Sequence, residues 1–433
     1  MGIEMTDLED AKGITGVAGK PGFSGEGASI ALGELCEIMN GYAFKSKQYV
    51  DGGIRVIRIA NVQKGYLEDS HPCFYPASMK RSIAQFLLNE NDLLLSLTGN
   101  VGRVAFLDKR FLPAALNQRV ACLRIKDESQ LNKRYLFHCL NSMCFENRCI
   151  ESANGIAQKN LSTVWLRGYA IPVPQMDKQL EIARRFDLIQ AQIDRAKAQM
   201  IKLDALVKSR FNELFGGCSA KVGADWPSVP ISEVVQKPKS GEWGEEDLVG
   251  DGIKVLRTTN FTDTGVVDYA KVVTRQIDRK KLTNKGLKHG DILIEKSGGS
   301  DKKPVGRVVL FEGEDNVYLN NNFTAALRIK DATEVDYRYL FHFMYMNYWQ
   351  GGTRSFESKT TGLHNLKLGD YLAKTKIAVP PIGDQRDFSA FVCQVDKLRF
   401  MLLGNPSPTY RSRSFCCSTN SGNGRVILEV NDY

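Results

Sequence analysis

The order of apolar and polar positions along the chain predicts short strands joined by turns, with few helices between them. Apolar, β-rich runs occupy residues 54–59, 92–97, 102–107 and 119–125, and glycine, asparagine and aspartate separate them, as strands joined by turns require. Over residues 132–149 the apolar residues return with helical spacing instead. The pattern therefore predicts an α+β unit with a curled, mostly antiparallel sheet.

Residues 175–216 follow a different pattern. No glycine or proline occurs over residues 176–215, and apolar residues recur in alternating steps of three and four, with one break at Arg210. This predicts a long helix with a heptad seam that needs a helical partner. Roughly forty residues at about 1.5 Å each give a rod of about 60 Å. The alternative, an amphipathic helix lying on its own domain, is less favoured, because so long a helix would extend beyond a domain of this size.

A shorter stretch over residues 383–403 repeats the start of this pattern, and Gly404 and Pro406 end it. We expect this distal helix, about half as long as the central one, to pair with it through the apolar positions of the two patterns. The positions expected to pair them are Ile182, Phe186, Ile189, Ile193, Met200, Leu203, Val207, Phe388, Phe391, Val395 and Leu398.

The first half of the chain recurs in the second half. Residues 123–127 return unchanged as residues 327–331, and residues 101–104 return as residues 305–308, both displaced by 204 positions. A nearly constant displacement indicates that one domain was duplicated with small insertions in loops, because solenoid repeats are far shorter.

These patterns divide the chain into six parts. They are a flexible leader (1–29), a first repeated domain (30–174), a central helix (175–216), a second repeated domain (217–382), a shortened distal helix (383–403) and a divergent tail (404–433).

Composition narrows the class of protein. At 433 residues the chain is too long for one ordinary core. The net charge of +9 favours polyanionic partners, nucleic acid first, although diffuse surface charge kept for solubility is an alternative. The ten cysteines contain no CxxC pair, so we expect reduced thiols and no zinc site. No run of eighteen apolar residues or signal peptide is present, which predicts a cytoplasmic protein.

No catalytic constellation is found. Gly19-Lys20 comes nearest to a phosphate-binding P-loop, but the first glycine is missing and Pro21 follows the lysine. We therefore expect no catalytic residues, no metal site and no cofactor bound by this chain.

A nuclease-like set of carboxylates with a lysine is suggested by Asp291, Glu295 and Lys296. The other copy keeps the first of these as Asp92 but has Ser96 in place of the glutamate, so the duplicated unit does not preserve the set. We expect Asp92 and Asp291 to have a structural role instead, in an Asx-type turn at the mouth of a strand.

Loops beside the predicted strands of both copies carry residues suited to DNA. Asparagine and glutamine pair with adenine, arginine and lysine pair with guanine, and lysine, serine and threonine suit phosphates. For any single residue a turn-forming asparagine or a solvated lysine is the simpler alternative, and occurrence in both copies is what favours the set. In the first copy the candidates are Arg58, Asn61, Lys64, Thr98, Asn100, Arg103, Asn117, Gln118, Arg119, Lys159 and Asn160. In the second copy they are Arg257, Thr259, Asn260, Lys296, Ser297, Lys302, Lys303, Arg307, Asn320, Asn321, Asn322, Lys359, Thr360, His364 and Asn365.

With these motifs in their order, the layout resembles the specificity subunit of type I restriction-modification systems. Each half ends in an Ile-x-Val-Pro element. It is Ile-Pro-Val-Pro at residues 171–174 in the first half and Ile-Ala-Val-Pro at residues 377–380 in the second. A glutamine-bearing helix start follows at residues 175–179 and 381–385. The resemblance covers about residues 30–400.

The resemblance implies a mechanism without catalysis in this chain. Each repeat would be a target recognition domain that reads one half of an asymmetric bipartite site in double-stranded DNA. The central and distal helices would pack as an antiparallel coiled coil and would dock two modification (methyltransferase) subunits, which use S-adenosylmethionine. Restriction subunits would translocate and cut with ATP and Mg. The short distal helix and the divergent tail depart from the family pattern, which puts burial of the central seam and assembly in doubt.

Two other classes of function remain open. A stand-alone restriction or methylation enzyme would need cofactor and carboxylate motifs that the sequence lacks. A structural adaptor with two similar domains would bind DNA weakly and without strong salt dependence.

Overall fold

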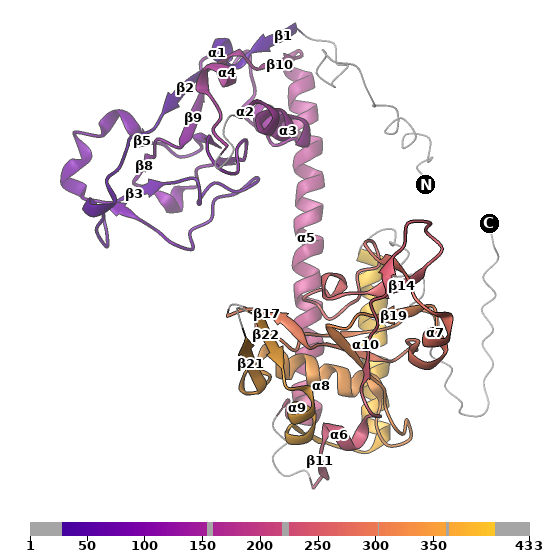
Figure 1. Cartoon of the computed structure of the whole chain (residues 1–433). Helices are drawn as coiled ribbons and strands as arrows, with labels where there is room; N and C mark the ends of the chain where they lie inside the picture. The colour runs from indigo at the N-terminus through magenta and orange to yellow at the C-terminus, as the bar shows by residue number, and fades with distance from the viewer. Residues whose placement is uncertain (1–27, 154–158, 219–224, 302, 361–362, 403–433) are drawn as a thin grey trace. The chain divides into compact units, whose positions relative to one another are not determined.

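The computed structural model divides the chain into two compact units, Met1–Ile193 (unit 1) and Asp194–Tyr433 (unit 2) (Figure 1). It describes residues 28–153, 159–218, 225–301, 303–360 and 363–402. Most of the predicted leader and the whole predicted tail lie outside the described residues. Within the described part, no helix is both long and apolar enough to span a membrane.

Unit 1 is built on two four-stranded sheets. The first is antiparallel, in the order β2 (Cys36–Asn40), β9 (Val120–Ile125), β6 (Leu93–Ser96) and β7 (Val104–Phe106). The second, in which β3 and β8 are parallel, has the order β4 (Phe74–Tyr75), β3 (Ile54–Ile57), β8 (Ala114–Leu116) and β5 (Leu87–Leu88). Strands β3, β6, β7 and β9 lie within the predicted β-rich runs, whereas β2, β4, β5 and β8 lie outside them. The mostly antiparallel sheet expected here is divided into two sheets.

Strand β6 shows why two sheets form. Its side chains alternate between two faces, as in any strand. Leu93 and Leu95 enter the core that contains the helices, whereas Leu94 enters a second core shared with the other sheet. All four residues of β6 are buried, so this strand is covered on both faces.

The remaining elements of unit 1 are short. They are the strand pair β1 (Ala28–Ala31) and β10 (Ala170–Val173), and the helices α1 (Leu32–Leu35), α2 (Lys133–Leu140), α3 (Met143–Ser152) and α4 (Thr163–Gly168). The single helix predicted over residues 132–149 is two helices, because the Ser142 side chain accepts the N–H of Phe145 and begins a new helix.

Unit 2 repeats this plan. Its antiparallel sheet has the order β12 (Lys239–Ser240), β20 (Thr324–Leu327), β16 (Ile292–Glu295) and β18 (Val308–Leu310). Its second sheet, with β14 and β19 parallel, has the order β13 (Glu245–Glu246), β15 (Val273–Gln276), β14 (Ile253–Leu256) and β19 (Tyr318–Asn320). The strand pair β11 (Ser228–Pro230) and β23 (Lys376–Ala378) matches β1 and β10. The helices of this unit are α6 (Ile231–Val234), α7 (Arg279–Lys285), α8 (Tyr337–Trp349) and α9 (Leu368–Lys374), and unit 1 has 3-10 helices in the region that corresponds to α7. The predicted α+β class is thus confirmed.

Unit 2 also has a third, three-stranded sheet. It consists of β17 (Ser297–Gly299), β22 (Leu363–Leu366) and β21 (Glu357–Thr360). At the corresponding place the described part of unit 1 shows a single bridge between Thr98 and Asn160. The short 3-10 helices of the chain are η2 (Ser46–Gln48), η3 (Ala77–Lys80), η4 (Ala84–Phe86), η5 (Lys109–Phe111), η6 (Thr258–Asn260) and η7 (Arg354–Phe356).

The predicted long helix is present as α5 (Met176–Phe215), an uninterrupted helix of 40 residues. Within unit 2 its last turns pack against α10 (Ile382–Leu402). Phe211 lies 5.3 Å from Phe388, ring centre to ring centre, while Arg399 near the end of α10 bonds Asp204. Since positions rise along one helix as they fall along the other, the two helices are antiparallel.

The predicted seam is buried along only part of α5. Val207, Phe388 and Val395 are buried, and Leu203 and Phe391 pack against the same core. In unit 1, Ile182 packs against the core. Four other predicted seam residues are exposed, namely Phe186 (43%), Ile189 (52%), Ile193 (43%) and Leu398 (50%).

Phe211 and Phe215, outside the predicted seam, are fully buried. The buried positions of this end of α5 follow steps of four from Val207, because a straight helix drifts from a heptad repeat.

Candidate nucleic-acid interface

An aspartate–arginine pair fixes the central strand of each unit. Asp92, just before β6, accepts the backbone N–H of Asn89 at 2.8 Å, and the Arg124 guanidinium holds its carboxylate at 2.9 and 2.7 Å. Asp291 and Arg328 repeat the pair at 2.7 and 2.6 Å. Hydrogen bonding to the carboxylate raises the pKa of each arginine above its ordinary value. The structural role predicted for both aspartates is confirmed. The hydrogen-bonded turn lies before each aspartate along the chain, because the carboxylate accepts the N–H of the residue three positions earlier.

A buried asparagine closes the same loop in each unit. The Asn61 side chain accepts the N–H of Arg58 and donates to the Glu68 carbonyl, both at 2.9 Å. Asn260 makes the two corresponding bonds, also at 2.9 Å. The asparagines are 5% and 0% exposed, so these two candidate base contacts use their amides within their own loops.

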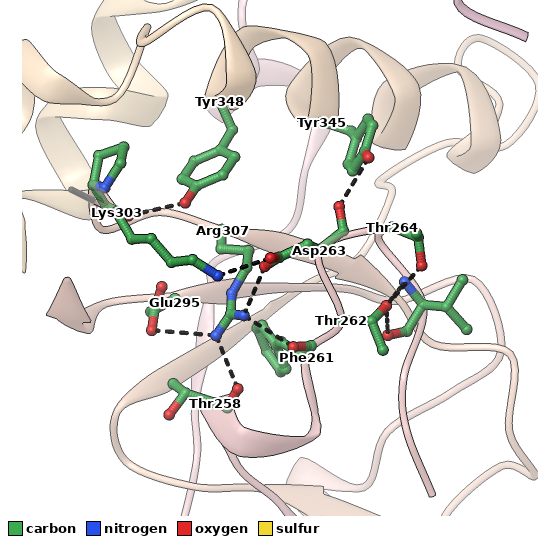
Figure 2. Close-up of polar contacts among 12 residues, drawn as sticks. Thr258, Phe261, Thr262, Asp263, Thr264, Glu295, Lys303, Arg307, Tyr345 and Tyr348 are labelled. Atoms are coloured by element: carbon green, nitrogen blue, oxygen red, sulfur yellow. Dashed lines mark hydrogen bonds and ion pairs between the residues drawn. The ribbon is translucent and has the colours of Figure 1, made fainter. Parts of the chain in front are cut away.

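The recurring arginine of the Val-Gly-Arg-Val motif also bonds inside its unit. In unit 2, Arg307 donates at 2.9 Å to the carbonyls of both Phe261 and Thr258, and Figure 2 shows its guanidinium between that loop and Glu295. Burial raises the pKa of Glu295, and the Arg307 charge, 3.8 Å away, opposes the shift. In unit 1, Arg103 donates to Gln63 at 2.6 Å.

A tight turn beside the central strand is built alike in both units, and we call it the turn edge. In unit 1 it comprises residues 117–120, and the N–H of Leu97 donates to the carbonyl of its third residue at 2.9 Å. In unit 2 it comprises residues 321–324, and the N–H of Lys296 makes the corresponding bond at 2.8 Å.

Two glycines allow the chain to cross closely beside the turn edge. A Cβ on Gly41 would overlap the backbone of Asn117, and a Cβ on Gly241 would overlap the backbones of Asn320 and Asn321. The residue after each glycine donates its N–H to the end of a parallel strand at 2.8 Å, to Leu116 in one unit and to Asn320 in the other. The turn edge is therefore held by backbone in both units.

The third sheet of unit 2 is joined to its neighbouring loop by Glu357. This carboxylate accepts the N–H of Val305 at 2.9 Å and lies 3.0 Å from Nδ1 of His364. His364 is 6% exposed, so this candidate DNA contact is buried between the loop that carries Val305 and the β21–β22 hairpin.

Burial separates the predicted DNA-binding residues into groups. The exposed ones are Lys64, Asn100, Gln118, Arg119, Lys159, Asn160, Thr259, Lys303 and Asn322. The half-buried ones are Arg58, Arg103, Asn117, Arg257, Lys296, Ser297, Arg307 and Asn365. The buried ones are Asn61, Thr98, Asn260, Asn320, Asn321 and His364. Lys302 lies outside the described residues, and Lys359 and Thr360 belong to β21.

Two of the exposed lysines already have acidic neighbours. Lys64 lies 2.6 Å from Glu146, and Lys303 lies 2.7 Å from Asp263. Because these pairs are solvent-exposed, each contributes about 0–1 kcal/mol. The two ion pairs therefore add little to the stability of the fold.

Sequence reasoning assigned no role to a glutamine that organises each unit. The Gln179 side chain accepts the N–H of Asn132 at 2.8 Å and donates to the carbonyls of Gln130 and Pro174. Gln385 makes the equivalent bonds in unit 2, and both side chains are fully buried. Their recurrence after the two Ile-x-Val-Pro elements was the signal that could have identified them.

The thiols and carboxylates of the described residues do not form a metal centre. No group of three or more histidine, cysteine, aspartate or glutamate side chains converges there. The eight described cysteines are free. Burial raises the pKa of Cys36 to about 11 and that of Cys149 to about 12, so these thiols stay protonated near neutral pH.

Comparison with known proteins gives a consistent result. Residues 27–203 match the family described as the type I restriction modification DNA specificity domain. The chain is 22% identical over 319 residues to the EcoBI specificity subunit of Escherichia coli, covering 67% of this chain and 63% of that protein. It is 30% identical over 164 residues to the E. coli EcoAI specificity subunit, covering 37% of this chain and 28% of that protein. The matches thus span less than two thirds of either relative.

A solved structure shares the fold. The S subunit of the type I restriction-modification system from M. genitalium superposes with a TM-score of 0.51 at 14% identity, covering 87% of this chain and 91% of that one.

Proposed function

We propose that this chain is the sequence-reading, non-catalytic subunit of a type I restriction-modification complex, because residues 27–203 match the specificity domain and the chain is similar to known specificity subunits. It would bind an asymmetric, bipartite site in double-stranded DNA, with each unit reading one half. Its role is to select the DNA on which partner subunits act.

The observation that carries this proposal is one scaffold presenting two different surfaces. The pairs Asp92–Arg124 and Asp291–Arg328, each with a buried aspartate, are the same in both units. The exposed residues of the turn edges differ, with Gln118 and Arg119 in unit 1 and Asn322 and Phe323 in unit 2. A constant scaffold with variable exposed side chains is what two readers of unlike sequences require, since base edges are read by side chains.

The long helix supports a bipartite target. Helix α5 continues without a break from residues of unit 1 to residues of unit 2. In proteins that read two half-sites, protein geometry fixes the spacing between them. We therefore expect the length of α5 to determine the number of base pairs between the two half-sites.

The partners and cofactors follow from the same proposal. Two modification subunits would dock on the helices and methylate adenine with S-adenosylmethionine, and restriction subunits would use ATP and Mg. The exposed apolar residues Phe186, Ile189 and Ile193 of α5 give such a partner a surface to bury.

A salt titration of the full chain tests this function. We expect selection from a random duplex library to enrich a two-part sequence, and the logarithm of its binding constant to fall linearly with the logarithm of salt concentration. Each phosphate contact contributes a slope of about −0.9. A structural adaptor would enrich no sequence and show little salt dependence.

A matched pair of lysines sharpens the test. Lys159 is exposed, and its carbonyl accepts the N–H of Gly99, two residues after the strand residue that bonds the turn edge. Lys178 is exposed on α5 and pairs with Glu181. Lys159→Gln should reduce the salt slope by about 1, and Lys178→Gln should leave it unchanged.

A further inference from the structure

One position on the turn edge carries opposite chemistry in the two units. Arg119 and Phe323 are 204 positions apart, the displacement of the unchanged pentapeptide at residues 123–127. Each is the third residue of its turn, and its carbonyl accepts the N–H of the corresponding strand residue, at 2.9 Å from Leu97 and 2.8 Å from Lys296. The two side chains therefore leave the same backbone frame.

The turn that carries Phe323 is fixed by hydrogen bonds of the buried residues on either side of it. The N–H of Asn321 donates to the Leu256 carbonyl at 2.9 Å, and the N–H of Thr324 donates back to Asn321 at 3.1 Å. The Thr324 hydroxyl also donates to the Asn321 carbonyl, at 3.0 Å, and the Asn320 amide donates to this hydroxyl at 3.1 Å. These three residues are buried, so the turn offers only Asn322 and Phe323 to solvent.

The Phe323 ring does not contribute to the core. It is 50% exposed and belongs to none of the hydrophobic clusters of the described residues. Only one other described phenylalanine is exposed by more than a third, and that residue, Phe186, stacks on His138 at 5.3 Å. Within the described part of the chain Phe323 pairs with no other aromatic ring and joins no core cluster, so core packing does not explain an aromatic residue at this place.

The surroundings of Phe323 are polar and cationic. Asn322 precedes it, and Lys296, whose ammonium group lies 3.1 Å from the Ser240 hydroxyl, bonds its carbonyl. A protein-binding patch would be expected to group several apolar side chains. A single exposed ring among hydrogen-bond donors matches a DNA base edge instead, because phenylalanine contacts the thymine methyl group while polar neighbours contact adjacent bases and phosphates.

We propose, resting on the function proposed above, that Phe323 is a specificity-determining residue that contacts the 5-methyl group of a thymine in the major groove. Arg119, at the corresponding position of unit 1, contacts a guanine through its O6 and N7 atoms. The corresponding positions of the two units thus read different bases, because one carries a cationic side chain and the other an apolar one.

The test uses the full-length chain and a random library of double-stranded DNA. From the enriched duplex, each thymine is replaced in turn by deoxyuridine, which lacks only the methyl group. In the half-site altered by Phe323 variants, we expect one replacement to weaken binding about fourfold, the worth of one buried methyl group. Phe323→Ala should bind thymine and deoxyuridine duplexes equally, and Phe323→Arg should enrich guanine at that position.

The controls separate an effect on base recognition from an effect on the stability of the fold. Leu248 is also apolar, lies in unit 2 and is 87% exposed, so Leu248→Ala should leave the enriched sequence unchanged. Arg119→Phe should alter one position of the other half-site only. Phe323→Ala should keep the wild-type thermal unfolding curve, because its ring is in no core cluster.

Three results would overturn the inference. An unchanged sequence preference in Phe323→Ala would show that the ring reads no base. An equal loss of affinity for every sequence would show that it contacts DNA without reading it. If the wild-type chain enriched no sequence at all, the proposed function itself would fail, which is distinct from the first two results.

Discussion

Replacing Phe211 should destabilise unit 2 more than any exposed position of the same helix. Its side chain is fully buried, and its ring lies 5.1 Å from Phe215, 5.3 Å from Phe388 and 5.6 Å from Tyr339. Truncation of a buried phenylalanine to alanine costs about 3–5 kcal/mol. We expect Phe211→Ala to lie in this range, because the surrounding rings come from three different helices and cannot collapse together into the cavity.

Ile201→Ala is the matched control, because Ile201 lies on the same helix within unit 2. Its side chain is 69% exposed, so its removal should change stability by about 0.5 kcal/mol or less. Guanidinium unfolding should be followed by fluorescence of Trp226, whose ring lies 6.2 Å from Phe215. Equal losses for the two variants, or a loss below about 1 kcal/mol for Phe211→Ala, would refute the assignment of Phe211 as the centre of the α5–α8–α10 contact.

Three further predictions follow from particular contacts. Asn61→Ala should destabilise unit 1 by about 1–3 kcal/mol, because it leaves buried backbone groups unpaired, whereas the exposed Asn100→Ala should be near neutral; equal unfolding midpoints would contradict this. Burial, reinforced by Arg338 and Arg399, lowers the pKa of His342 to about 3. Its unfolded form binds a proton below pH of about 6.5, so unit 2 should lose stability as pH falls from there towards 3, by up to about 1.4 kcal/mol per pH unit. His342→Gln should flatten that dependence, and an unchanged slope in urea titrations would argue against it. Ile189→Asp, on the exposed seam of α5, should leave folding intact but weaken assembly with modification subunits, measured by light scattering; unaltered complexes would show that this seam is not the docking surface.

The elements could be predicted where one periodicity dominates. The strands at residues 54–57, 93–96 and 120–125 have short apolar runs bounded by turn residues, and the 40 residues of α5 lack glycine and proline. The break at Ser142 was missed, because a serine that caps a new helix differs from one within a helix only by a backbone conformation. Arg210 was interpreted as a defect in the seam, whereas the buried positions had moved to Phe211.

The candidate site was predicted less well, for a different reason. Occurrence in both copies was used to favour DNA contacts, yet it selects residues that the shared fold requires. Asn61 and Asn260, each hydrogen-bonded within its own loop, show this most clearly. Residues that distinguish one target from another need to differ between copies, and Phe323 was overlooked because its counterpart is Arg119. Only burial, which the structure supplies, separates the two kinds of residue.

The central claim is that two unlike readers, each on the same scaffold, divide one DNA site between them. The most direct measurement exchanges residues 30–174 for the corresponding segment of another specificity subunit and determines the enriched sequence of the hybrid chain. We predict that one half of the recognised site changes and that the other half and the spacing remain. A change in both halves, or in neither, would contradict the account.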